Sequence, residues 1–593
     1  MMEPFERIDI QELPLSVPAF RRQVEDFLGR NGLRLEEVDL YMAVLSDDGE
    51  ILAGGGLSRD VIKCIAVSGT ARSLGLSVPL VSRLVSVAAE GGFTNVKVFT
   101  KPENQAVFES LGFRLLAEAP QAVLMENGRG LEDYCAYLRA HRADGVIVMN
   151  ANPFTLGHRF LVEQASMSFR APEGRRNLVV LPVKEEASRF PYAERLEMIR
   201  RGCDGIADVV EGSDYQISAA TFPTYFLKNL SDASETQMRL DLDLFGRHIA
   251  PALGATVRFV GSEPADPLTA RYNALMKEIL PSHGVQVVEI KRLKSSDGRF
   301  VSASRVREQL DKGSYSAAKA LTPVLTWPYL MADLAERALR MELDAPLKPG
   351  LVGPDSNGAH GDMDYTLMRR SIAAIRPYFS RMALAASADE LRQLGIDAEK
   401  AMLAATGGVN GHRGAIFALG LAVSVFWRRM ESIDNKLVMQ KCLAQTAQTL
   451  LDNSQSDSKL HSTDFSHGET AVQKYGVKGA RAMALDGYKD LLVFWQPYYH
   501  GIRRQPFALQ RTLIHLIASL DDTCLIHRVG YERAVQLREE ASEIFGEIAH
   551  GSDYERMESL LKGLCTRYAA EGASPGGAAD MLALTVFIDS LLS

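Results

Sequence analysis

The sequence has few cysteines, no excess of positive charge and no long apolar run. Its six cysteines are scattered without a C-x-x-C pair, so neither a zinc site nor a disulfide framework is indicated and a reducing compartment is favoured. The formal net charge of -8 at pH 7 argues against a nucleic-acid partner. The N-terminus has no basic segment followed by an apolar stretch, and no run of about 18 apolar residues occurs. We therefore expect a cytoplasmic protein that binds neither nucleic acid nor a membrane.

The chain of 593 residues contains enough apolar material for several cores, with 46% hydrophobic and 24% charged residues. Its length predicts about three to four domains. Strand-like runs alternate with helix-like stretches as far as about residue 315, and helix-period apolar patterns replace them from about residue 325. These patterns predict helices at residues 330–341, 415–430, 437–451, 471–493, 508–519, 532–549 and 578–592. The sequence therefore predicts a multidomain protein with α/β domains at residues 1–130 and 140–318 and an all-α domain at residues 325–593.

The first predicted domain contains three strand-like runs and one helix-like stretch, at residues 40–45, 61–67, 96–100 and 79–89. It closes with Asn-Gln-Ala-Val-Phe-Glu-Ser-Leu-Gly-Phe at residues 104–113. This ending resembles that of acetyltransferases of the N-acetyltransferase (GNAT) type, with a compressed spacing, and the resemblance implies an acetyltransferase-like fold. The turn at residues 72–77 has one glycine where that family usually has two or three. We therefore favour a docking or CoA-moiety-binding surface over an active acetyl-CoA site.

The second predicted domain opens with the motif Asn-Pro-Phe-Thr-Leu-Gly-His at residues 152–158, which follows an apolar run typical of a buried parallel strand. A helical period then begins at residue 156, so Thr155 and His158 fall at a helix N-terminus, whose free N–H groups and positive dipole attract phosphate. Gly157 permits close approach of the backbone. Asn152, Thr155 and His158 are therefore predicted to bind ATP, and Thr155 and His158 to donate hydrogen bonds to charge that develops on the α-phosphate.

The motif Val-Ser-Ala-Ser-Arg-Val-Arg at residues 301–307 is expected to complete the ATP site, because guanidinium and hydroxyl groups suit the remaining phosphates. Further strand-like runs at residues 177–182, 255–260 and 284–290 predict a Rossmann-like parallel sheet with its site at the carboxyl ends of the strands. The phosphate-binding candidates in this part of the chain are Lys184, Ser302, Ser304, Arg305 and Arg307.

These two motifs resemble the T-x-G-H and I-S-x-[ST]-x-V-R motifs of the nucleotidyltransferase superfamily, with Thr155 in place of the first histidine that many members carry. Together with the preceding acetyltransferase-like region, residues 1–318 resemble citrate lyase ligase. The resemblance implies an enzyme that forms acetyl-AMP and pyrophosphate from acetate and ATP. It further implies that the acetyl group passes to a thiol on the acyl carrier subunit of citrate lyase.

The all-α region carries polar, glycine-rich loops between its predicted helices. Asp362 and Asp364 on one such loop supply hard oxygen ligands suited to Mg²⁺. The glycines at residues 407–408 give backbone N–H groups room to approach phosphates. Lys348, Arg413, Arg481 and Arg528 can neutralise a triphosphate, and Glu469 or Asp580 can act as a general base, so these loops predict a second ATP site.

The loops of residues 325–593 resemble triphosphoribosyl-dephospho-CoA synthase, with small departures at residues 353–354 and at Cys524. The resemblance implies that the 2′-hydroxyl of dephospho-CoA displaces adenine from the ribose of ATP and leaves the triphosphate intact. It assigns catalytic roles to Asp362, Asp364 and Glu469. The expected ATP-binding positions are Lys348, Asn357, His360, Gly407, Gly408, Asn410, His412, Arg413, Arg481, His527, Arg528 and Asp580.

The two resemblances together predict a bifunctional maturation enzyme for citrate lyase that uses ATP, Mg²⁺, acetate and dephospho-CoA. One alternative keeps both chemistries but serves malonate decarboxylase. A second combines a true acetyl-CoA-dependent transferase with an adenylyltransferase that acts on CoA precursors. A third, from another class, is a non-catalytic scaffold that binds the carrier protein, and the intact motifs argue against it.

Overall fold

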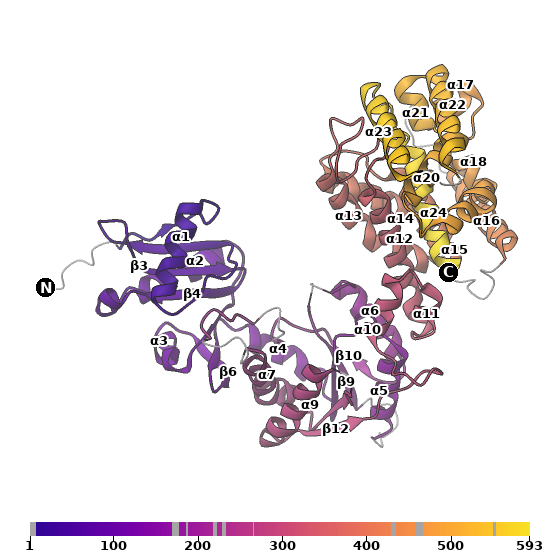
Figure 1. The fold of residues 1–593 in the computed structure, drawn as a ribbon. Coiled ribbons are helices and arrows are strands. Elements are labelled where there is room, and N and C mark those ends of the chain that lie inside the picture. Colours follow the sequence, from indigo (N-terminus) through magenta and orange to yellow (C-terminus); the bar gives the residue numbers. More distant parts are fainter. Residues whose placement is uncertain are drawn as a thin grey trace. The chain divides into compact units, whose positions relative to one another are not determined.

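The computed structural model describes residues 8–592, apart from residues 169–176, 186–187, 217–221, 228–232, 265, 428–434, 457–466 and 550–552. The chain divides into two compact units, Met1–Val301 and Ser302–Ser593. Within the described residues, none of the helices combines the length and the apolar content that a membrane crossing requires. The predicted fold class, α/β regions followed by an all-α region, is confirmed (Figure 1). The three-domain division stays a prediction.

The first unit opens with a seven-stranded mixed sheet in the order β1-β2-β3-β4-β5-β7-β6. Only β4 and β5 pair in parallel, at Val61–Lys97 and Ile62–Val98. Residues of β4 alternate between buried and half-buried positions. Ile62 lies in a core that contains α2, whereas Cys64 and Ala66 lie in a core that contains α1. The predicted strands at residues 40–45, 61–67 and 96–100 are confirmed. The elements are β1 Gln11–Glu12, α1 Pro18–Arg30, β2 Leu40–Leu45, β3 Ile51–Ser58, β4 Val61–Val67, α2 Ser77–Glu90, β5 Val96–Thr100, α3 Gln105–Ser110, β6 Arg114–Ala119 and β7 Ala122–Asn127.

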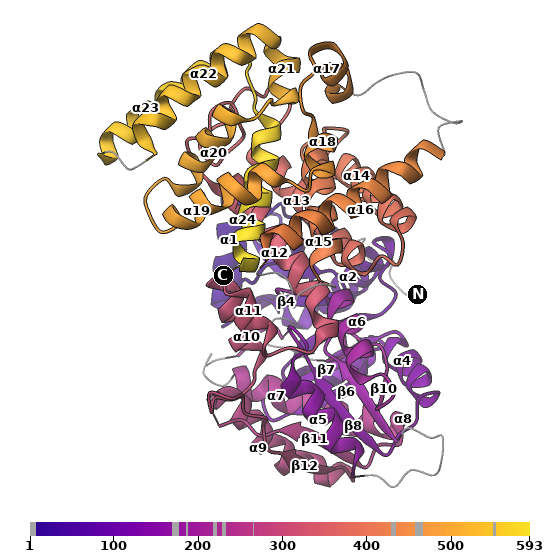
Figure 2. The same cartoon turned by 90° about the vertical axis from the view of Figure 1, so that its right-hand side faces the viewer.

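A second sheet in the same unit has five parallel strands in the order β10-β9-β8-β11-β12, which confirms the predicted parallel sheet. Figure 2 shows β8 and β11 of this sheet, with α5 beside them. Because all strands run the same way, the loops after β8 and β9 meet at one edge. The elements are α4 Gly130–Arg139, β8 Gly145–Met149, α5 Leu156–Ser166, β9 Leu178–Pro182, α6 Tyr192–Cys203, β10 Asp208–Val209, α7 Ala233–Leu244, α8 Ala250–Leu253, β11 Val257–Gly261, α9 Pro267–Ile279 and β12 Gln286–Ile290.

The second unit is helical, and its central helix α24 is buried along most of its length against α12, α15 and α20 (Figure 1). The predicted helices at residues 330–341, 508–519 and 578–592 lie within α12, α20 and α24. The elements are α10 Ala303–Asp311, α11 Tyr315–Lys319, α12 Trp327–Asp344, α13 Tyr365–Leu384, α14 Ala388–Thr406, α15 Arg413–Phe426, α16 Lys436–Ser456, α17 His467–Tyr475, α18 Ala480–Leu485, α19 Gln496–Ile502, α20 Ala508–Ser519, α21 Thr523–Val529, α22 Tyr531–Ile548, α23 Tyr554–Ala570 and α24 Gly576–Leu592.

One predicted helix, at residues 471–493, is interrupted. Gly476 follows α17 and Gly487 follows α18, with φ angles of 69° and 71°. This left-handed conformation ends a helix, and glycine adopts it without a steric penalty. A Cβ atom at Gly487 would also lie 2.1 Å from the carbonyl oxygen of Gln440 in α16, so the chain must turn here.

Candidate functional sites

The N-terminus of α5 carries the first candidate site. Thr155 is its N-cap, and the Thr155 hydroxyl oxygen accepts the backbone N–H of His158 at 3.3 Å. The His158 ring returns the contact, because its Nδ1 lies 3.0 Å from the Thr155 backbone nitrogen and 2.9 Å from the Thr155 hydroxyl. This reciprocal arrangement is a capping box, which fixes the start of the helix and the orientation of the ring.

The hydrogen bonds of His158 also determine where its proton lies. Burial, assisted by the nearby Arg292, lowers the pKa of His158 to about 4, so the ring is neutral near pH 7. Since Nδ1 accepts the Thr155 backbone N–H, the single proton of the neutral ring is on Nε2. His158 is therefore a neutral hydrogen-bond donor at a helix N-terminus, an arrangement that suits a phosphate oxygen.

Gly157 lies against the backbone at the end of the first unit. A Cβ atom at this position would lie 2.9 Å from the carbonyl oxygen of Val301. The close backbone approach predicted at Gly157 is therefore an approach to the backbone of Val301. In the second unit, Ser302 caps α10 by accepting the Arg305 backbone N–H at 3.2 Å, and Arg307 donates to the Ser304 hydroxyl at 3.1 Å. The phosphate-binding roles of Ser302, Ser304, Arg305 and Arg307 stay predictions.

Arg195 in α6 is a buried residue that the sequence did not single out. Its side chain is 0% exposed and donates hydrogen bonds to the carbonyl oxygens of Asn150, Val183, Glu185 and Phe190. These four residues belong to the loops that follow β8 and β9, so one guanidinium group holds both loops at the carboxyl edge of the sheet. An arginine in the first turns of a helix is usually solvated, so the residue type alone did not indicate a buried role.

Two further predicted residues lie in these loops. The Asn152 side-chain oxygen accepts the Phe190 backbone N–H at 3.1 Å, so Asn152 joins the two loops. Lys184 is exposed, and its Nζ lies 3.5 Å from a carboxylate oxygen of Asp214. An exposed ion pair of this kind is weak, so Lys184 is available to a ligand.

The second candidate site lies in the helical unit around Lys348. The Lys348 side chain is 1% exposed, and its Nζ donates to the backbone carbonyl oxygen and to Oε1 of Glu342, each at 2.6 Å. Asp580 belongs to the same cluster, and burial together with the charges of Asp522 and Glu342 raises its pKa well above the usual range. A carboxyl group with a raised pKa is suited to proton transfer near neutral pH.

The backbone of Gly414 lies very close to the side chain of Asp580. A Cβ atom at Gly414, in the first turn of α15, would lie 2.0 Å from Oδ2 of Asp580. Asp522, which was not among the predicted site residues, is 4% exposed and accepts the backbone N–H groups of Cys524, Leu525 and Ala578 at 2.8, 3.1 and 2.8 Å. It thereby joins the start of α21 to the start of α24, which carries Asp580.

Two histidines flank this cluster. His412 is 4% exposed, and its Nδ1 lies 2.7 Å from the hydroxyl of Ser371 in α13. Burial and then the charge of Lys348 lower the pKa of His412 to about 4. His360 accepts a hydrogen bond from Arg528 at Nδ1 (3.0 Å), and its Nε2 lies 2.9 Å from the Ser574 hydroxyl. The structure therefore brings His412 beside Lys348, and His360 beside Arg528.

Asp362 and Asp364 are the predicted metal ligands. Asp362 has a side chain that is 63% exposed, and its Oδ1 lies 3.8 Å from the ring of His360. Asp364 is the N-cap of α13, where Oδ1 accepts the Leu367 backbone N–H at 2.7 Å, so its second oxygen is available to a ligand. Among the described residues, no group of three or more metal-ligating side chains occurs. The Mg²⁺ site at Asp362 and Asp364 stays a prediction.

The remaining predicted residues that the structure describes lie at exposed positions of the second unit. Asn410 accepts the Arg413 backbone N–H at 3.2 Å, and Arg413 forms an ion pair with Glu399. Gly407 and Gly408 have φ angles of 67° and 94°, so they turn the chain after α14. The side chain of Glu469 lies outside the described residues. The exposed residues also include Asn357, Arg481 and His527.

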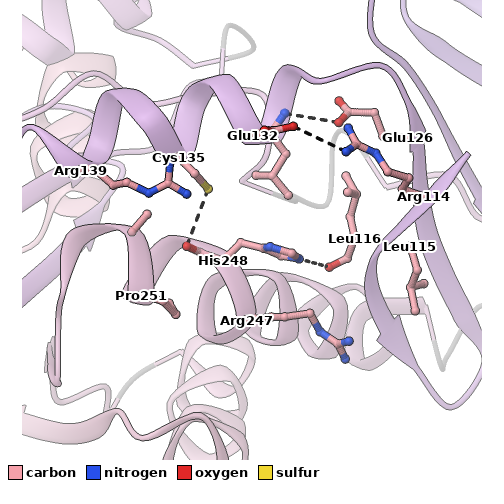
Figure 3. Close-up of a pocket in the computed structure, with 12 residues that line it drawn as sticks. Arg114, Leu115, Leu116, Glu126, Glu132, Cys135, Arg139, Arg247, His248 and Pro251 are labelled. Carbon is pink, nitrogen blue, oxygen red and sulfur yellow. Dashed lines mark hydrogen bonds and ion pairs between the residues drawn. The ribbon is translucent and has the colours of Figure 1, made fainter.

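A cavity of about 410 Å³ lies between β6, α4 and α8 of the first unit (Figure 3). His248 Nε2 donates to the Leu116 carbonyl oxygen (2.9 Å), and the Cys135 thiol lies 3.7 Å from the His248 carbonyl oxygen. Arg114, one of its cationic residues, already pairs with Glu132 at 3.6 Å. The residues that line this cavity include none of the residues predicted from the sequence.

Comparisons with known proteins match the two parts of the chain separately. A family model of the citrate lyase ligase C-terminal domain matches residues 144–330, and one of ATP:dephospho-CoA triphosphoribosyl transferase matches residues 328–593. A [citrate [pro-3S]-lyase] ligase from Klebsiella pneumoniae is 43% identical over 329 residues, which cover 53% of this chain and 94% of the relative. A probable 2-(5''-triphosphoribosyl)-3'-dephosphocoenzyme-A synthase from Azotobacter vinelandii is 36% identical over 273 residues, which cover 44% of this chain and 90% of that relative.

Proposed function

The chain belongs to the citrate lyase ligase family in its N-terminal part and to the triphosphoribosyl-dephospho-CoA synthase family in its C-terminal part, and we propose that it makes the precursor of the prosthetic group of citrate lyase and acetylates that group once it is attached to the carrier. One protein would then supply two steps of the same maturation. The proposed substrates are ATP, acetate and dephospho-CoA, and the proposed protein partner is the acyl carrier subunit of citrate lyase.

The observation that carries the ligase proposal is the hydrogen bond from the Thr155 backbone N–H to His158 Nδ1 at the N-terminus of α5, which leaves Nε2 to donate. In this reaction a carboxylate oxygen of acetate attacks the α-phosphorus of ATP, and the bond to pyrophosphate breaks. His158 would donate to the α-phosphate oxygen on which charge develops. The Thr155 hydroxyl accepts the His158 backbone N–H in the cap, so we assign to it the orientation of the ring. A carrier thiol then attacks the acetyl carbon, and AMP leaves.

The synthase reaction has different requirements. The 2′-hydroxyl of dephospho-CoA attacks C1 of the ribose of ATP, adenine leaves, and the triphosphate stays intact. A transition state of this kind has oxocarbenium character and needs a base for the attacking hydroxyl. Asp580 suits that role, because burial and then the charges of Asp522 and Glu342 raise its pKa. We therefore propose Asp580 as the proton acceptor.

Mg²⁺ would be held at Asp362 and at the second oxygen of Asp364, together with phosphate oxygens. When bound, the ion neutralises charge on the triphosphate. Lys348 cannot do this alone, because its ammonium group is already paired with Glu342.

The experiment that tests the proposal is a pair of assays on the full chain. With ATP, Mg²⁺ and dephospho-CoA, chromatography should detect free adenine; with ATP, Mg²⁺, acetate and the thiol-bearing carrier subunit, it should detect acetate-dependent pyrophosphate release. Absence of adenine with dephospho-CoA would remove the synthase proposal. Pyrophosphate release that does not depend on acetate would favour an adenylyltransferase. A carrier from malonate decarboxylase, used in parallel, distinguishes the two client enzymes.

Two substitutions separate the sites while preserving their helix caps. His158→Gln keeps a side-chain acceptor for the Thr155 N–H, and Asp364→Asn keeps an acceptor for the Leu367 N–H. We expect His158→Gln to lower acetate-dependent pyrophosphate release by about 10²–10³-fold and to spare adenine release. Asp364→Asn should do the reverse. A folded variant that loses both activities would contradict the two-site proposal.

A further inference from the structure

Ser371 and His412 form a buried pair between α13 and the start of α15. Ser371 is 0% exposed and His412 is 4% exposed, and the Ser371 hydroxyl lies 2.7 Å from His412 Nδ1. A glycine at position 411 leaves room for this contact, because a Cβ atom there would lie 3.4 Å from the Ser371 oxygen and 2.9 Å from the Met368 sulfur. The pair is therefore built into the packing of the two helices.

The buried hydroxyl proton of Ser371 needs an acceptor. Among the described residues, the hydroxyl makes no hydrogen bond except the one to His412. Other helix serines donate to a backbone carbonyl of the preceding turn, as Ser380 of the same helix does to Pro377 at 3.2 Å. A buried O–H without an acceptor is costly, whereas an unused lone pair on a hydroxyl oxygen costs less. Ser371 therefore donates to Nδ1 of His412.

This direction of donation determines the tautomer of His412. The ring is neutral, so a lone pair on Nδ1 places the proton on Nε2. Nε2 is buried, and in the part of the chain that the structure describes no hydrogen-bond partner reaches it. An N–H group in this position needs an acceptor from a ligand, and the ammonium group of Lys348 nearby favours an anionic one.

We propose that Ser371 is a positioning residue that holds His412 in the Nε2–H tautomer, so that His412 donates to a phosphate oxygen of ATP in the synthase site. This inference rests on the proposed synthase function. Ser371 belongs to none of the sequence motifs. His412, which the sequence predicts to bind ATP, acts in this proposal as a neutral hydrogen-bond donor.

Nitrogen-15 NMR of the full chain, labelled at its histidines, tests the tautomer directly. We assign the His412 signals by their loss in His412→Gln. The expected spectrum has a protonated Nε2 and an unprotonated Nδ1, and addition of ATP with Mg²⁺ shifts the Nε2–H signal. A protonated Nδ1 overturns the proposal, as does an Nε2 signal that ATP does not move. The NMR measurement needs no turnover, so a wrong tautomer can be distinguished from a failure of the proposed synthase function.

Kinetics of adenine release test the role of Ser371. Ser371→Ala should lower kcat/KM for ATP by about tenfold, since one positioned hydrogen bond is lost, and Ser371→Thr, which keeps the hydroxyl, should restore most of it. Ser380→Ala is the matched control on the same helix, and it should leave adenine release unchanged. Acetate-dependent pyrophosphate release should be the same in all three. If Ser371→Ala and Ser380→Ala give equal kinetics, Ser371 has no positioning role.

Discussion

Replacement of Lys348 by methionine should destabilise the helical unit strongly. The Lys348 and Glu342 side chains are 1% and 8% exposed, and their charged atoms lie 2.6 Å apart. Methionine fills a similar volume but leaves the Glu342 carboxylate buried without its cation, close enough to Asp580 to raise the pKa of that residue. Breaking a buried ion pair in this way costs about 3–5 kcal/mol. At about 2–4 °C per kcal/mol, the Tm of this unit should fall by roughly 6–20 °C.

Calorimetry of the full chain, with residual adenine release after heating as a second readout, measures this loss. The double variant Lys348→Met with Glu342→Leu removes both charges, so it should recover to within about 1 kcal/mol of the original protein. Lys562→Met is the matched control, because Lys562 pairs with Glu558 at 3.1 Å while their side chains are 60% and 35% exposed. It should cost less than about 0.5 kcal/mol.

Two results would refute this reasoning. If Lys348→Met lowers the free energy of unfolding no more than Lys562→Met does, burial does not increase the cost of removing the cation that pairs with Glu342. If the double variant is no more stable than Lys348→Met alone, the loss arises from packing and not from the uncompensated carboxylate.

Three further outcomes are expected. Arg195→Met should raise the KM for ATP in acetate-dependent pyrophosphate release by at least about tenfold, because the loops after β8 and β9 lose their shared donor; unchanged kinetics would exclude a positioning role, and adenine release is the internal control. Gly414→Ala should abolish adenine release by displacing Asp580, whereas Gly546→Ala, with no atom within 4 Å of its Cβ position, should be tolerated. The pKa of His412 is lowered from 6.5 to about 4, so the unfolded chain binds more protons in this window and stability falls as pH drops through it; His412→Asn should reduce that fall by on the order of 2–3 kcal/mol, and an equal fall in both proteins would contradict a neutral buried ring.

Local sequence determined the elements whose signals lie within a few residues. The apolar run at residues 145–149 and the Thr155–His158 spacing specify a strand and a capped helix start, and both are confirmed. Strand and helix periods depend on short-range geometry, so they can be read without knowledge of partners. Helices α13 and α14 were not predicted, because their polar residues obscure the apolar period.

The motifs of the sequence also indicated two ATP sites, and their resemblance to two families, which the comparisons confirm, indicated the reactions. Tertiary structure alone decided which of those side chains meet. Ser371 reaches His412 across 41 residues, and Asp522 reaches the start of α24 across 56. A contact between helices depends on which faces pack together, and the period of one helix does not specify its neighbour. Burial of Arg195 and of the Lys348–Glu342 pair follows from the same packing, so their roles appear only in the folded chain.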